Sequence, residues 1–133
     1  MPLSNDRNTP YRETQTVVIR VAAGAKIFGG ALVAVNAAGF AVPGSVSATL
    51  TYVGRAECKA DNTGGADGAK SVEVRRDKAF KWINSGADPI GQADLFKTCY
   101  IVDDQTVAKT NAASTRSVAG RIVGLDVDGV WVE

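Results

Sequence analysis

The chain has 133 residues, 45% of them apolar, and a formal net charge of +1. This length suits one domain with its own core, and this apolar content excludes a wholly disordered chain. The near-zero charge argues against a protein whose main task is to hold nucleic acid, because such proteins usually carry a clear basic excess. No apolar run approaches the roughly 18 residues of a membrane span, and the first residues lack the apolar region of a secretory signal. We therefore expect synthesis in a cytoplasm and no membrane contact.

The chain contains no histidine and two cysteines, Cys58 and Cys99. Histidine is the usual general base near neutral pH, so its absence argues against Ser-His-Asp and Cys-His catalytic sites. Neither cysteine has a nearby metal-ligand partner, which argues against a zinc site. We expect no enzymatic activity and no cofactor. Both cysteines are expected to be reduced and buried as small apolar groups, with a disulfide as the alternative in an oxidising compartment.

Residues 1–13, MPLSNDRNTPYRE, are polar and contain two prolines. Few apolar groups are available there to hold the segment against a core, so it is predicted to be an extended arm that precedes a domain over residues 14–133. Tyr11 and Arg12 are the arm residues of the types most favoured as interface anchors. A frayed terminus without a role is the alternative interpretation.

The first half of the chain then reads as short strands separated by glycine-rich breaks. Strands are predicted over residues 14–22, 31–35, 40–42 and 49–58, on β-branched content and alternation. Gly54, inside the last of these, predicts a bulge or bend. The polar stretch 59–70 predicts an exposed loop. Its acidic residues do not have the spacing of an EF-hand, and no glutamate closes such a site.

Residues 71–84 predict two strands joined by a turn at 76–78. Phe80 and Trp82 alternate along the second strand, close to the basic residues Arg75, Arg76 and Lys81. That combination is typical of a stacking platform for single-stranded nucleic acid, and the alternative places both aromatic rings in the core. One helical turn is expected within 89–96, with Asp94 as a candidate cap.

The last third, from Cys99 to Glu133, packs four short β-type runs between turns. Asp128-Gly129 is predicted to form a type I′ turn, which folds Trp131 and Val132 back on residues 125–127. In total, about nine short strands with turn signals between them predict an all-β barrel or sandwich with less than about one-sixth helix. No domain boundary or internal repeat interrupts the pattern.

The C-terminal residues 89–133 carry a pattern that we relate to a known family. They read PIGQADLFKTCYIVDDQTV, then a polar loop, then SVAGRIVGLDVDGVWVE. This resembles small capsid decoration (cement) proteins of tailed bacteriophages, in which AD…YxVDDxTV is followed by AGxIxxxDxxGVxV. The matching residues are Ala93, Asp94, Tyr100, Val102, Asp103, Asp104, Thr106, Val107, Ala119, Gly120, Ile122, Asp126, Gly129, Val130 and Val132. With the hairpin at 31–43, the likeness covers about half of the chain.

The resemblance implies a small β-barrel or β-tulip that lies on the outside of a phage head, in the virion, after synthesis in the bacterial cytoplasm. It implies bridging of major capsid protein subunits to stabilise the shell, as a homotrimer or, alternatively, a dimer. Capsid or subunit contacts are expected at Tyr11, Arg12, Arg75 and Arg76, with no direct nucleic-acid contact. The alternatives are a β-barrel binding module for single-stranded nucleic acid or glycan, or a phage tail or fibre subunit.

Overall fold

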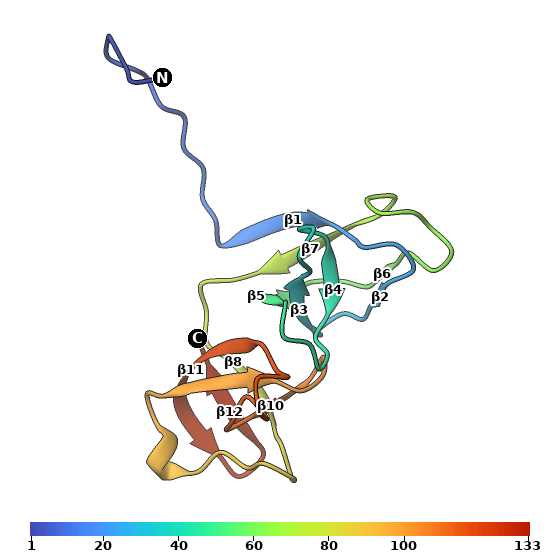
Figure 1. The fold of residues 1–133 in the computed structure, drawn as a ribbon, viewed down its shortest axis with the longest axis vertical. Coiled ribbons are helices and arrows are strands. Elements are labelled where there is room, and N and C mark those ends of the chain that lie inside the picture. Colours follow the sequence, from blue (N-terminus) through green and yellow to red (C-terminus); the bar gives the residue numbers. More distant parts are fainter.

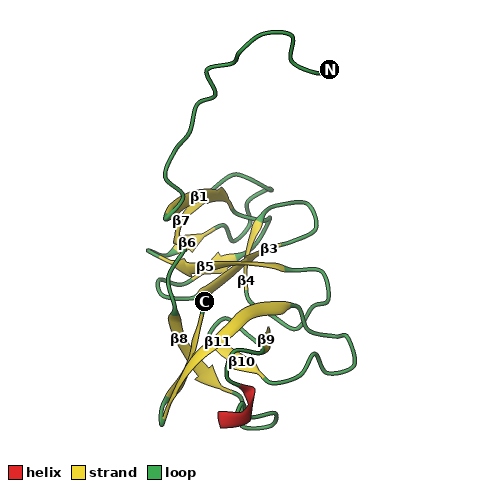
Figure 2. Ribbon diagram, turned by 90° about the vertical axis from the view of Figure 1, so that its left-hand side faces the viewer, coloured by secondary structure: helices red, strands yellow, loops and turns green.

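The computed structural model describes all residues 1–133 and shows an all-β protein with one short 3₁₀ helix, η1 (Gln92–Asp94). The predicted all-β class and low helix content are thereby confirmed. The strands form two bodies stacked along the long axis, an open sheet from the first half of the chain and a ring of strands from the second (Figures 1 and 2). No helix is long and apolar enough to cross a membrane.

The open sheet has five strands in the order β1-β7-β5-β3-β4, and every neighbouring pair is antiparallel. Their bounds are β1 (Thr16–Arg20), β3 (Leu32–Val35), β4 (Ala41–Pro43), β5 (Thr51–Ala56) and β7 (Ser71–Arg75). A separate two-stranded pair, β2 (Lys26–Ile27) with β6 (Ala60–Asp61), lies beside them. At one end the sheet almost closes, because Val21, just after β1, bridges Ala41 of β4.

The second half of the chain forms a closed ring of pairings in the order β10-β8-β12-β11-β9. The bounds are β8 (Phe80–Asn84), β9 (Thr98–Ile101), β10 (Thr106–Ala108), β11 (Val118–Asp126) and β12 (Gly129–Val132). The β8–β10 pair is parallel, and the other pairs are antiparallel. The ring takes in only these C-terminal strands, and the open sheet completes the same small domain.

The predicted pair of strands over 71–84 is present, but the two strands do not pair with each other. β7 pairs with β1 and β5 in the open sheet, whereas β8 pairs with β12 and β10 in the ring. Residues 76–79 therefore connect the two bodies and are not a hairpin turn. Val72 and Val74 face the core of the sheet and Phe80 and Trp82 face the core of the ring, so burial on separate cores outweighs local pairing.

Strand β3 joins the two cores. Leu32 and Ala34 pack in the cluster inside the ring, whereas Val33 packs in the cluster of the open sheet, and all three are fully buried. The Leu32 N–H donates to the carbonyl of Asp104, at 2.8 Å, which ties β3 to the loop before β10. Gly44 lets this loop approach, because a Cβ there would lie 2.7 Å from the carbonyl oxygen of Asp103.

Two local predictions are confirmed. On β5 the register shifts between the pairs Val33↔Gly54 and Ala34↔Tyr52, which leaves Val53 as the bulged residue beside the predicted glycine. In η1, the Asp94 carboxylate accepts a hydrogen bond from the Gly91 N–H at 2.8 Å, as a capping side chain does.

The loop 59–70 is largely exposed, as predicted, with one buried polar residue at its centre. Asn62 is 2% exposed, and its amide nitrogen donates to the carbonyls of Val21, Ala22 and Ala66 at 2.9–3.3 Å. These bonds satisfy backbone groups that would otherwise be buried without a partner. Asn62 therefore holds the loop against the end of β1.

The C-terminal hairpin forms, but the predicted type I′ turn at Asp128-Gly129 is wrong. Asp126 pairs with Gly129, so the two-residue turn is Val127-Asp128. Gly129 is the first residue of β12, is buried, and is not among the residues with positive φ. Glycine is needed there for space, because a Cβ would lie 2.6 Å from Lys81 Cγ and 2.9 Å from the carbonyl oxygen of Trp82.

The cysteines are both free, but only one of them is buried. Cys99 on β9 is fully buried in the ring, as predicted. The prediction of a buried Cys58 is wrong. β5 ends at Ala56, so Cys58 falls in the exposed turn that follows and not on the alternating face of the strand.

Replacing Gly129 by Val is expected to lower the free energy of unfolding by more than about 1 kcal/mol, because the new side chain overlaps neighbouring backbone and must displace β8. Chemical denaturation measures this change. The matched control is Gly86→Val, since Gly86 is exposed and a Cβ added there would have no atom within 4 Å. Equal stability of the two variants would contradict the close packing of β12 on β8.

The two thiols are expected to react at very different rates in the native protein. Burial raises the pKa of the Cys99 thiol to about 12, so little of the reactive thiolate is present at neutral pH, whereas Cys58 is exposed. Mass spectrometry after brief treatment with a thiol reagent should show a single adduct, on Cys58. A second adduct, formed at a similar rate, would show that Cys99 is accessible.

Candidate assembly surface

The most prominent exposed feature is the N-terminal arm. Residues 1–15 are all exposed and lie outside any strand or helix, and the arm projects away from the two bodies (Figures 1 and 2). Tyr11 is 94% exposed. The structure therefore leaves Tyr11 and Arg12 in solvent, where a partner can reach them.

The root of the arm is anchored to the connection between the two bodies. The Arg76 N–H donates to the carbonyl of Gln15 at 2.8 Å, and the Thr14 hydroxyl donates to the Asp77 carboxylate at 3.4 Å. Arg75 and Arg76 are thus brought to the point where the arm begins, whereas Asp128 and Gly129 belong to the hairpin of β11 and β12. Of the predicted contact residues, the structure groups Arg75 and Arg76 at the arm root and leaves Tyr11 and Arg12 further out.

The arm continues directly into β1, which is an edge strand. Gln15 and Val21 are hydrogen-bonded to Arg76 and Lys70, the residues on either side of β7. Antiparallel ladders alternate, so the odd-numbered residues of β1 bond to β7. The backbone groups of Thr16 and Val18 consequently face outward, where the sheet has no further strand, whereas β4 approaches the end of β1 beyond Val18 through the bridge between Val21 and Ala41. Such an edge is a template for pairing with another chain, and the Val18 side chain on it is 71% exposed.

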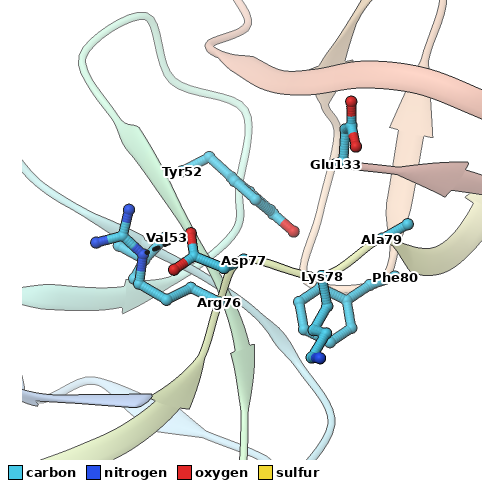
Figure 3. Close-up of a pocket in the computed structure, with 8 residues that line it drawn as sticks. All are labelled: Tyr52, Val53, Arg76, Asp77, Lys78, Ala79, Phe80 and Glu133. Carbon is cyan, nitrogen blue, oxygen red and sulfur yellow. Dashed lines mark ion pairs between the residues drawn. The ribbon is translucent and has the colours of Figure 1, made fainter. Parts of the chain in front are cut away.

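A cleft separates the open sheet from the ring beside the arm root (Figure 3). Tyr52 projects into the cleft from β5, and the C-terminal Glu133 lies on the opposite wall. The connection contributes Arg76 and Asp77 to the lining, and β8 contributes Phe80. The Arg76–Asp77 ion pair, at 3.7 Å, joins two side chains that are both more than 40% exposed. An ion pair of this kind contributes little stability, so these charges are available to a partner.

Each of the two bodies has a buried polar atom near this cleft that lacks a hydrogen bond. The Tyr52 hydroxyl and the Trp82 indole nitrogen are both buried without a partner. Burial raises the pKa of Tyr52 to about 12. The nearby Trp82 N–H opposes this rise only weakly, because the two groups do not reach hydrogen-bond geometry.

Arg55 and Arg75 are directly paired across β5 and β7, and one carboxylate serves both. Glu57 accepts from the Arg55 guanidinium at 2.8 Å and from Arg75 at 3.4 Å. The hydrogen bond from Arg55 is the main cause of a lowered pKa of Glu57. Gly54 permits this close approach, because a Cβ there would overlap the carbonyl oxygen of Arg75.

Phe80 and Trp82 lie in the core, and the stacking platform considered for them is not formed. Both rings are inside the ring of strands, 8% and 5% exposed, with centroids 6.1 Å apart. Sequence reasoning instead missed Trp131, which is 36% exposed and donates from its indole nitrogen to Asp126 at 2.8 Å. Its position between Val130 and Val132 in an alternating strand could have identified it as outward-facing.

Sequence reasoning also missed the open edge of β1. The uninterrupted apolar run Val17-Val18-Ile19 breaks the alternation that a strand with one solvent face should show, and this was the available signal. A strand added at this edge would place its own side chains next to the exposed Val18.

No three His, Cys, Asp or Glu side chains lie close enough together to hold a metal ion. Comparison of the chain with protein-family models, with curated proteins and with solved structures finds no match. The resemblance to phage decoration proteins therefore rests on the residue pattern over 89–133 and at 31–43.

The stability of the fold is expected to fall as the pH rises above 9. The pKa values of Cys99 and Tyr52 are about 12 in the folded chain against ordinary values of 9.0 and 10.0, so the unfolded chain loses these protons first. Each group then lowers the free energy of unfolding by up to about 1.4 kcal/mol per pH unit, until the pH reaches its folded pKa.

The variant Tyr52→Phe isolates this effect. It should be at least as stable as the unchanged chain at neutral pH, because it removes a buried hydroxyl without a partner, and it should lose less stability above pH 10. Urea denaturation over a pH series measures both. Tyr11→Phe, at an exposed position, is the control. An identical alkaline slope in the two variants would contradict the buried state of the Tyr52 hydroxyl.

Proposed function

We propose that the protein is a structural component of a phage virion, which binds the outside of the head and bridges neighbouring copies of the major capsid protein. The observation that carries this proposal is an exposed arm that runs without interruption into an unpaired strand edge. An arm and an edge are complementary adhesive surfaces, because the backbone of one can complete the sheet of the other. The residue pattern over 89–133 supports the choice of a phage capsid.

The energetics of the arm favour order only on a partner. Fixing a backbone costs roughly 1–2 kcal/mol per residue, and an arm whose residues are all exposed gains no burial to offset that cost. Pairing with a neighbour's strand and insertion of Tyr11 and Arg12 into the partner's surface would supply the missing contacts. Many copies on one shell then let modest contacts add up.

The same geometry favours a homotrimer. Each copy has one arm to donate and one open β1 edge to accept it, so the contact joins two different surfaces. Contacts of that kind close into rings when the rotation between copies allows, and a trimer is the smallest ring beyond a swapped dimer. Arg75 and Arg76 at the arm root would then lie where a neighbouring copy and the major capsid protein approach.

The alternative function, a module that stacks single-stranded nucleic acid or glycan on Phe80 and Trp82, loses its main support because both rings are buried. The near-neutral charge of the chain also suits a protein that crowds on a shell beside its own copies. The proposed location is therefore the outer capsid surface, after synthesis in the bacterial cytoplasm.

Removal of residues 1–13 is expected to leave the fold intact and to weaken binding to capsids. The truncated chain begins at Thr14, so it keeps the hydrogen bonds from Thr14 and Gln15 to the connection at 76–77. Its melting temperature should match that of the full chain. Co-sedimentation with phage heads that lack the protein measures the binding. At equal concentration, far less of the truncated chain than of the full chain should pellet with the heads.

The edge of β1 is tested separately by Val18→Lys, which places a charge on the outward face of the strand, as natural edge strands do. The control is Val127→Lys, at an even more exposed valine in the turn between β11 and β12. We expect Val18→Lys to lower the oligomer mass in light scattering and Val127→Lys to leave it unchanged. Full binding and full oligomerisation by both the truncated chain and Val18→Lys would refute the proposal.

A further inference from the structure

A second open groove, which shares Lys78, Ala79 and Phe80 with the Tyr52 cleft, lies where the open sheet meets the ring. Its volume is about 470 Å³, within the range of ordinary ligand sites. The lining residues are Gly30, Arg55, Arg75, Lys78, Ala79, Phe80, Lys81, Trp82 and Trp131. Four of these nine are cationic and none is acidic, although the whole chain has a net charge of only +1. We call it the basic groove.

The cations of the basic groove are only partly neutralised. Arg55 and Arg75 share the single carboxylate of Glu57, and Lys78 is in no ion pair. Lys81 is the exception, since its ammonium contacts the carboxylates of Asp128 at 3.1 Å and of Asp126 at 3.8 Å. The part of the groove around Arg55, Arg75 and Lys78 therefore carries positive charge in excess of its own carboxylate.

Two features hold these charges in place. The Arg55 guanidinium lies over the Phe80 ring, 5.0 Å from its centroid, which fixes it against the floor of the groove. Arg75 is held by Glu57, which accepts from its terminal nitrogen at 3.4 Å, and by the burial of its Nε. Both side chains remain more than one-third exposed, and a guanidinium held in this way is suited to a carboxylate, which accepts two parallel N–H bonds.

We propose that the basic groove binds an acidic peptide segment of a partner protein, with carboxylates beside Arg55, Arg75 and Lys78 and an apolar side chain against Trp131. Trp131 forms one wall, and although the Lys81 ammonium lies over its ring, 5.7 Å from the centroid, the side chain is 36% exposed and offers its remaining surface to such a contact. The proposal does not depend on the phage function, because it follows from the charges and the shape of the groove alone.

A peptide fits the basic groove better than a nucleic acid does. Binding of a single strand relies on several exposed aromatic faces in succession, and here Phe80 and Trp82 are buried, which leaves only Trp131. A strand of phosphates also needs a long basic track, whereas the Lys81 end of the groove is occupied by Asp128. Two carboxylates match the local excess, which is the charge of Arg55, Arg75 and Lys78 less that of Glu57.

The test uses the full-length chain and fluorescence anisotropy with three labelled probes of equal length: a peptide of alternating Glu and Gly, the same peptide with Gln for Glu, and oligo-dT. The Glu peptide should bind at low salt and weaken as salt is added, and the Gln peptide should not bind. Lys78→Glu should weaken binding by about tenfold or more, because it inverts a charge in the groove.

Lys78→Arg keeps the charge and should keep the affinity, and Lys109→Glu inverts an exposed lysine outside the groove and should have no effect. Circular dichroism and melting temperature show whether each variant is folded. Equal binding of the Glu peptide by Lys78→Glu and Lys109→Glu, or no binding at all, overturns the proposal. Tighter binding of oligo-dT that is lost in Lys78→Glu overturns it in favour of a nucleic-acid site.

Discussion

The double burial of β3 is the constraint on which the rest of the structure depends. Leu32 and Ala34 face the core of the ring, and Val33 faces the core of the open sheet, all without exposed surface. A strand covered on both faces needs a continuous apolar run, and residues 31–35 provide one. Burying a side chain such as that of Leu32 contributes about 1.5–3 kcal/mol, so each body gains stability from the presence of the other. This shared strand makes one domain of two small cores.

Because the cores are satisfied around β3, the adhesive surfaces are free to lie at the periphery. β1 is at the far edge of the sheet, and the arm before it makes no contribution to either hydrophobic cluster. The connection at 76–79 crosses between the bodies and brings the arm root, the Tyr52 cleft and the basic groove into one region. A partner that binds there would meet both bodies at once, which suits a protein that stiffens an assembly.

The local structure was largely predictable from the sequence, and the pairing of distant segments was not. Alternation located β5, β7 and β8, and Asp94 and Gly54 were placed correctly. The partners of β7 and β8 were missed because nothing local states that two adjacent strands pack on different cores. The sequence predicts Gly129 to provide backbone freedom in a turn, whereas the close approach of β8 explains why a glycine is needed there. The site was predicted only in part: the arm is exposed, but the β1 edge and Trp131 emerge from strand order and burial.

The proposed function requires that the arm becomes ordered on a capsid. An electron-microscopy reconstruction of phage heads incubated with the protein measures this order directly. We expect density for the domain on the outer surface, with residues 1–13 resolved as an extended segment against a neighbouring copy or the major capsid protein. Bound domains whose arms have no density, or heads that carry no added density under saturating protein, would contradict the proposed function.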